Sequence, residues 1–173
     1  DALEVLMTGM IQGSPDLTPA DLPRVHETAL IVLYRLLFAF YAEARRLLPV
    51  DNATYRENLS VQTKLSEVAR RTDTGRAWAR ASSGLWQWFR DLSRIINEGD
   101  PETGVPEYDG GLFDPAEWPL LDDPRVVVPD FHMAAAIDRV GRDWDVESKE
   151  RAYLDYTELT VRELGSIYEG LLE

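Results

Sequence analysis

The sequence predicts a mainly α-helical fold, a helical bundle around one central hydrophobic helix with at most a small two-stranded β element. The segment 25–48 contains no Gly or Pro, and its only charged residue between Ala29 and Ala42 is Arg35. A helix that is apolar on all sides packs inside a protein with other helices around it. Further segments have apolar residues at helical spacing, and only two short runs are typical of strands.

A membrane span is the alternative interpretation of this central segment. A span needs roughly 20 apolar residues. Here charged side chains flank and interrupt a shorter apolar run; they are Glu27, Arg35, Glu43, Arg45 and Arg46. We therefore expect a buried central helix and no membrane partner.

Length and composition indicate one folded domain over residues 1–173, with 45% apolar residues and five Trp. The chain has no Cys, so we expect neither a disulfide nor a thiolate metal site. The absence of Cys fits a cytoplasmic location. Because the chain begins with Asp1 and stops at Glu173 inside an apparent helix, we expect a piece of a larger protein.

The formal net charge of −13 repels phosphate, so the domain by itself is not expected to bind nucleic acid. The charge is unevenly distributed along the chain. Residues 64–94 contain seven basic and three acidic side chains, whereas residues 95–130 contain ten acidic side chains and one Arg. A local basic surface is therefore compatible with an acidic domain.

The first half of the chain divides into helices. A first helix ends at the breaker 13–16, and Thr18 is the predicted N-cap of the next, with Pro19 at the first helical position. The central helix then ends at Pro49. A short helix is expected over 60–71.

A second long helix is predicted from about Arg76 to Asn97. Its apolar face, which we expect to lie in the core, comprises Trp78, Leu85, Trp88, Phe89, Leu92, Ile95 and Ile96. The opposite face includes four arginines, Arg76, Arg80, Arg90 and Arg94.

The acidic segment 98–124 has no lasting periodicity and contains Tyr108-Asp109-Gly110-Gly111-Leu112-Phe113. Two adjacent glycines permit positive φ, so we expect a tight turn that presents the last two residues of this motif to the core. The alternative is a functional loop, because irregular loops often carry sites.

In the C-terminal part, 126–128 and 152–156 are predicted as short strands that pair with each other. Asp130 is the predicted cap of a helix over 131–140, and the charged stretch 143–151 is expected to be a loop.

Thr160 and Glu163 match a capping box, which predicts a helix to the end of the chain. Gly165 inside that helix predicts close packing, because Gly costs about 1 kcal/mol there relative to Ala. One face of this helix carries Leu164, Ile167, Tyr168 and Leu171.

Three motifs occur in a fixed order: LYRLLFAFYAEARRLLP, YDGGLFDP and DYTELTVRELGSIYEGLLE. Together they resemble the helical region just upstream of the methyltransferase domain in large bacterial adenine-N6 DNA methyltransferases. This group includes single-chain type II restriction-modification enzymes and phage-defence methylases. The resemblance covers residues 25–173.

The resemblance implies a connector whose last helix, with Leu164, Gly165, Ile167, Tyr168 and Leu171, leads into the S-adenosylmethionine-binding domain. The family's Tyr-Thr-Pro loop and Asn-Pro-Pro-Tyr motif do not occur in this sequence. The resemblance therefore assigns no catalytic, cofactor or metal-binding residue here, and it implies S-adenosylmethionine only for the parent protein. The implied partners are sister domains, including a methyltransferase and in some members a nuclease, with DNA bound only by the intact protein.

The four arginines are the candidate contact surface for DNA phosphates. The alternative is a solvated face that pairs with the acidic segment after it. The YDGGLF loop is the candidate interdomain contact, with a structural turn as its alternative.

Two other functional classes stay open. One is a free-standing α-helical protein–protein interaction module with an acidic docking face. The other is a metal-dependent nuclease, because Pro129-Asp130 followed by Glu147-Ser148-Lys149 superficially matches the PD…ExK pattern. His26 and His132 have no ligand partner at i+3 or i+4, so surface or capping roles are expected for both.

Overall fold

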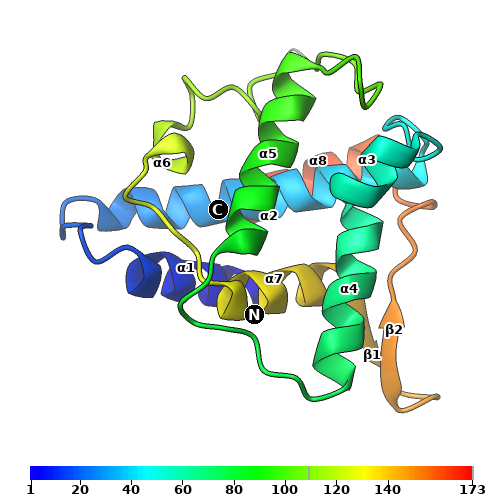
Figure 1. The fold of residues 1–173 in the computed structure, drawn as a ribbon, viewed down its shortest axis with the longest axis horizontal. Coiled ribbons are helices and arrows are strands. Elements are labelled where there is room, and N and C mark those ends of the chain that lie inside the picture. Colours follow the sequence, from blue (N-terminus) through cyan, green and yellow to red (C-terminus); the bar gives the residue numbers. More distant parts are fainter. Residues whose placement is uncertain (109, 173) are drawn as a thin grey trace.

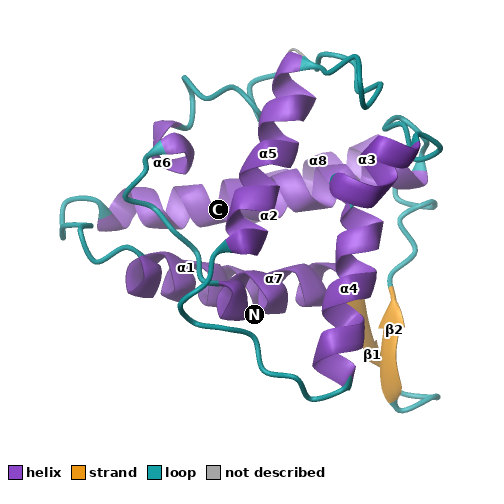
Figure 2. Cartoon of the chain, viewed as in Figure 1, coloured by secondary structure: helices purple, strands orange, loops and turns teal. Residues whose placement is uncertain are grey.

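The computed structural model describes residues 1–108 and 110–172, leaving aside the side chains of residues 168 and 170–172. The fold is mainly α with one small two-stranded sheet, as predicted (Figures 1 and 2). Within these residues the elements are α1 (Ala2–Gly13), α2 (Leu22–Ala44), α3 (Ala53–Asn58), α4 (Val61–Asp73), α5 (Gly84–Glu98), α6 (Pro119–Asp122), α7 (Asp130–Gly141), β1 (Arg142–Asp145), β2 (Glu150–Tyr153) and α8 (Val161–Leu172).

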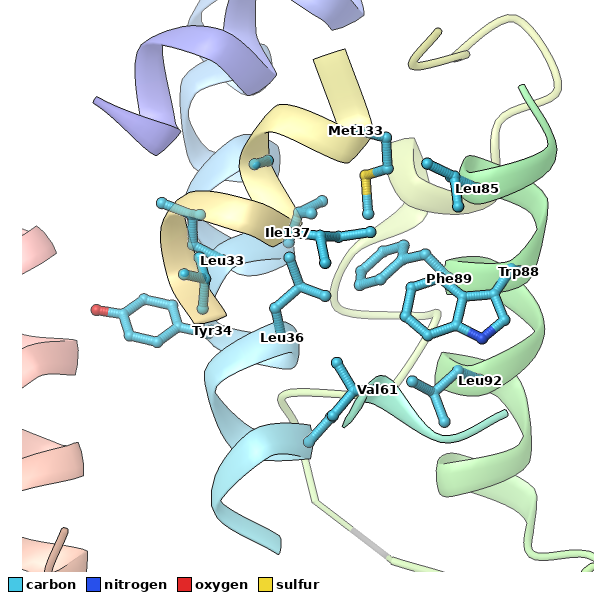
Figure 3. Close-up of a cluster of buried hydrophobic side chains, with 14 of the residues drawn as sticks. Leu33, Tyr34, Leu36, Val61, Leu85, Trp88, Phe89, Leu92, Met133 and Ile137 are labelled. Atoms are coloured by element: carbon cyan, nitrogen blue, oxygen red, sulfur yellow. The ribbon is translucent and has the colours of Figure 1, made fainter. Parts of the chain in front are cut away.

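The middle of the central helix α2 is buried within the bundle. Every residue from Thr28 to Leu36 is buried, and α1, α4, α6 and α7 pack against this helix. Figure 3 shows Leu36 of α2, Phe89 of α5 and Ile137 of α7 meeting in one apolar cluster. The helix that is apolar on all sides is therefore the centre of the core, as the sequence predicts.

By length and composition alone, α2 is able to cross a membrane, contrary to the expectation from its charged residues. However, 78% of its most apolar window is buried inside the protein. Most of its apolar surface is thus already covered by the rest of the protein.

The N-terminus of α2 differs from the prediction. The helix begins at Leu22 rather than Pro19, with Pro23 in its first turn. Thr18 does not cap it; instead the backbone N–H and hydroxyl of Thr18 donate to the carboxylate of Asp21, at 2.9 and 2.8 Å. This local turn takes up the residues that were expected to form the first helical turn.

The second long helix, α5, begins at Gly84 rather than Arg76. Residues 76–83 are irregular, and two of their carbonyl groups accept hydrogen bonds from the start of α7. The N–H groups of Asp130 and Phe131 donate to the carbonyls of Ser82 and Ala79, at 2.8 and 3.2 Å. Tertiary contacts thus override the helical periodicity in this segment.

Asp130 is the first residue of α7 and does not cap it, contrary to prediction; the N-cap position is Pro129. Its carboxylate instead accepts from the N–H of Leu85, at 2.8 Å, and from the hydroxyl of Ser82. Leu85 is in the first turn of α5, where backbone N–H groups have no intrahelical partner. Asp130 therefore ties α5 to α7.

The small sheet is a hairpin of β1 and β2, with Arg142 opposite Tyr153. The predicted pairing of 126–128 with 152–156 is wrong, and so is the loop predicted for 143–151. The segment 126–128 forms no strand, and its valines 126 and 128 are buried in the core. The hairpin lacks apolar alternation, and Arg142 anchors it through an ion pair with Asp138 of α7, at 2.6 Å.

A buried carboxylate at the end of α2 positions α4. Glu43, only 4% exposed, accepts four hydrogen bonds from the α3–α4 corner. The donors are the hydroxyls of Tyr55 (2.7 Å) and Ser60 (3.0 Å) and the backbone N–H groups of Val61 (2.7 Å) and Gln62 (3.2 Å). Since the N-terminus of a helix carries partial positive charge, a carboxylate there is stabilised.

We expect Glu43→Gln to lower the free energy of unfolding by about 2 kcal/mol, because the amide NH2 faces donors that then lack an acceptor. Burial raises the pKa of Glu43, and the four hydrogen bonds lower it in part. A raised folded-state pKa gives stability that is fully present below the unfolded value of 4.5 and is lost as the pH rises through the folded value. The advantage of the wild type over Glu43→Gln should therefore shrink from about pH 4.5 to about pH 7.

Urea unfolding at both pH values measures this difference. Glu27→Gln, a change of an exposed carboxylate on the same helix, is the matched control and should have little effect at either pH. A stability difference that grows with pH would contradict the sign of this prediction.

Candidate functional site

The three sequence motifs meet at one apolar groove of about 530 Å³. The groove lies between α2, the segment 111–118 and α8. Its lining includes Tyr34 and Phe38 of α2, Leu112 and Trp118 of the segment after the glycines, and Leu164 and Gly165 of α8. Segments that are far apart in the sequence thus form one surface, which we take as the candidate functional site.

The YDGGLF loop is fixed by side-chain contacts to α2 and to the segment that follows α2. The hydroxyl of Tyr108 donates to the carbonyl of Leu47, at 2.7 Å, and burial raises the pKa of Tyr108. The ring of Phe38 packs edge to face against those of Tyr108 and Phe113, with centroids 5.8 and 5.2 Å apart. Phe113 is buried, so part of the loop is the structural turn that the sequence predicts.

The rest of the loop faces the groove. The N–H of Phe113 donates to the carbonyl of Gly110, at 3.0 Å, which closes a turn. Gly111 does not have a positive φ; its carbonyl accepts from the indole N–H of Trp118, at 2.9 Å. Leu112 is half-exposed at the groove rather than buried. Asp109 lies outside the described residues.

Helix α8 forms the other wall of the groove. Its predicted capping box is confirmed: Glu163 N–H donates to the hydroxyl of Thr160, at 3.2 Å, and the carboxylate of Glu163 accepts from the Thr160 N–H, at 2.8 Å. The hydroxyl of Tyr34 donates to the carbonyl of Ile167, at 2.9 Å. Leu164 and Ile167 are half-buried, whereas the predicted face positions Tyr168 and Leu171 have side chains outside the described part.

The prediction of close packing at Gly165 is wrong. A Cβ atom built on Gly165 meets no atom of the described residues within 4 Å. The residue is exposed and borders the groove. The glycine leaves this part of the groove wall open.

The four arginines do not form one helical stripe. Arg76 and Arg80 lie in the irregular segment before α5 and are exposed, and Arg80 stacks on the ring of Phe131 with 4.0 Å to its centroid. Arg90 and Arg94 lie on α5 and face acids of the following segment, at 3.8 Å from Asp122 and 3.4 Å from Glu98. The predicted single face is therefore wrong, and DNA contact by these residues stays a prediction.

The acids of the PD…ExK pattern lie at opposite ends of α7. Asp130 is its first residue, whereas Glu147 lies in the turn of the hairpin that follows its last residue. A helix of 12 residues spans about 18 Å, so the two carboxylates are not brought together. Among the described residues no group of three or more His, Asp or Glu side chains is placed to hold a metal ion.

The two histidines lie apart from the groove. His26 is exposed, whereas His132 is 5% exposed and packs against Gly9 of α1. Burial lowers the pKa of His132. The prediction of a surface or capping role is thus wrong for His132, which belongs to the α1–α7 contact.

No protein-family model, curated protein or solved structure matches the chain. The resemblance to the region upstream of adenine-N6 methyltransferase domains therefore stays a prediction.

The open space at Gly165 predicts that a larger side chain is tolerated there. Gly165→Ala should raise the helicity of α8 and stabilise it by up to about 1 kcal/mol, because Ala is the better helix former. In contrast, a Cβ on Gly9 of α1 would lie 2.6 Å from that of His132, so Gly9→Ala should destabilise the protein by about 1–3 kcal/mol. Circular dichroism and urea unfolding measure both effects. A Gly165→Ala protein that loses as much stability as Gly9→Ala would show that the groove wall is packed.

Proposed function

We propose that the chain is a non-catalytic helical connector of a DNA adenine-N6 methyltransferase of the restriction-modification or phage-defence type. It couples upstream domains to the S-adenosylmethionine-dependent domain of the same polypeptide. The observation that carries the proposal is the convergence of the three family-like motifs on one apolar groove. The motifs that support the resemblance thus share a surface, which is expected if that surface has a common task.

In this proposal, an apolar side chain of the methyltransferase domain binds in the groove. The resemblance places that domain directly after α8, and α8 forms one wall of the groove. Burial of apolar surface stabilises such a contact by roughly 25 cal/mol per Å². The hydrogen bonds of α2 to Ile167 on α8 and to Leu112 on the loop then link the groove to the core.

DNA contact is a secondary part of the proposal and depends on the intact enzyme. Arg76 and Arg80 are the better candidates of the four arginines, because both are exposed and neither forms an ion pair within the described residues. Arg90 and Arg94 already face Asp122 and Glu98. Since the chain carries a net charge of −13, neighbouring domains supply most of the attraction for phosphate.

The first test is the parent reading frame. The proposal requires a Tyr-Thr-Pro loop and an Asn-Pro-Pro-Tyr motif encoded downstream of Glu173. A reading frame without them would remove the proposal and favour a free-standing interaction module.

In the parent enzyme, Leu164→Glu places a carboxylate in the groove and should lower kcat/KM for DNA methylation about tenfold or more, because an unpaired charge is costly to bury at a domain contact. Val146→Glu is the matched control, because Val146 is 79% exposed in the hairpin turn, away from the groove. Steady-state methylation assays compare the two. Equal activity of both variants would show that the groove is not a domain contact.

A further inference from the structure

A second pocket, of about 300 Å³, lies between α2, α5, α6 and the segment 113–115. Its lining combines three arginines with hydroxyl and amide groups: Arg35, Arg90, Arg94, Ser93 and Asn97. We propose that this pocket binds a phosphate group through the guanidinium of Arg35 and the hydroxyl of Ser93. The proposal does not depend on the connector function.

Arg35 is a buried cation with incomplete pairing. It is 6% exposed, and its Nε donates to the carbonyl of Leu112, at 2.8 Å. One terminal nitrogen, Nη2, is buried and has no hydrogen-bond partner among the described residues, and the guanidinium carbon lies 5.2 Å from the centroid of Phe113. Burial lowers the pKa of Arg35 to about 10. A buried charge of this kind is costly unless it is paired, so an anion in the pocket would complete its bonding.

Ser93 supplies a second group without a partner in the same pocket. The residue is 5% exposed, and its Oγ is buried without a hydrogen-bond partner in the described part of the chain. Arg90 and Asn97 lie three residues before and four residues after it on α5, which places all three on one helical face. Two independent elements, α2 and α5, thus each contribute to the lining of one cavity a side chain whose buried donor has no partner among the described residues.

The ligand chemistry follows from these donors. A guanidinium and a hydroxyl donate to tetrahedral oxyanions, and Arg binds phosphate oxygens with two parallel N–H groups. Arg90 and Arg94 are held at the pocket by Asp122 and Glu98, at 3.8 and 3.4 Å. The carboxylates in the lining, which include Asp91, balance the arginines in number. We therefore expect modest affinity that falls as the ionic strength rises.

The test is a titration of the chain with inorganic phosphate at constant ionic strength, adjusted with sodium chloride. A saturable rise in Tm is expected with phosphate, because a ligand that binds only the folded state stabilises it. Two-dimensional NMR should show shifts of α5 amides near Ser93 over the same concentration range. A Tm that does not respond beyond the chloride control would overturn the proposal.

Two variants separate binding from folding. Ser93→Ala removes a hydroxyl that has no partner, so we expect an unchanged Tm without phosphate and about tenfold weaker phosphate binding. Ser66→Ala, at an exposed serine of α4, is the matched control and should bind like the wild type. Arg35→Gln should abolish phosphate binding. It also removes the charged N–H donor to the carbonyl of Leu112, so its folding must be checked. Wild-type affinity in Ser93→Ala or in a folded Arg35→Gln protein would contradict the assignment.

Competition identifies the source of the phosphate group. If a short DNA duplex displaces bound phosphate from the wild type and does not itself bind to Ser93→Ala, the natural ligand of the pocket is a backbone phosphodiester. Phosphate binding that DNA does not displace indicates a free phosphate ion or a small phosphomonoester. Both outcomes support the pocket. Because the chain alone is used, failure here is distinct from failure of the methylation test on the groove.

Discussion

Glu43 lies in the last turns of α2, and its carboxylate accepts hydrogen bonds from two hydroxyls and two backbone N–H groups of the α3–α4 corner. The contact fixes the start of α4 against the central helix. α4 in turn packs on α7, and α7 packs on α1 and α5. One buried acid thus joins the central helix to the chain of packed helices, and four donors and the positive end of a helix offset part of its desolvation.

Arg35 is the second buried charge of α2, eight residues and about 12 Å along the helix from Glu43. The two charges have different surroundings. Four donors of the α3–α4 corner converge on Glu43, whereas Arg35 donates to the carbonyl of Leu112 and keeps an Nη2 without a partner among the described residues. The carboxylate of Glu43 has four hydrogen-bond donors from the fold itself. The guanidinium of Arg35, which lines a cavity, has a donor that the described residues do not use. This difference separates a structural charge from a candidate binding group.

Local sequence signals predict the parts of the fold that local interactions decide. The central helix is recognised by its unbroken apolar composition, the start of α8 by Thr160 and Glu163, and the buried end of the loop by Phe113. The start of α5 is not predictable in this way, because residues 79–82 bond to the backbone of α7, about 50 residues further along the chain. The hairpin sequence lacks the apolar alternation that predicts a strand. An ion pair between Arg142 and Asp138 holds the hairpin to α7, and no local pattern signals this contact. The pocket at Arg35 had one signal, a lone charge within an apolar helix, but its partners on α5 are set by packing.

Amide hydrogen exchange at Val61 tests the central role of Glu43 most directly. Val61 is the first residue of α4, and amides in the first turn of a helix have no intrahelical acceptor. Because its N–H lies 2.7 Å from the Glu43 carboxylate, it should exchange as slowly as amides in the middle of α2, through global unfolding only. Rapid exchange at Val61 while α2 stays protected would show that the corner opens independently, and would contradict the account.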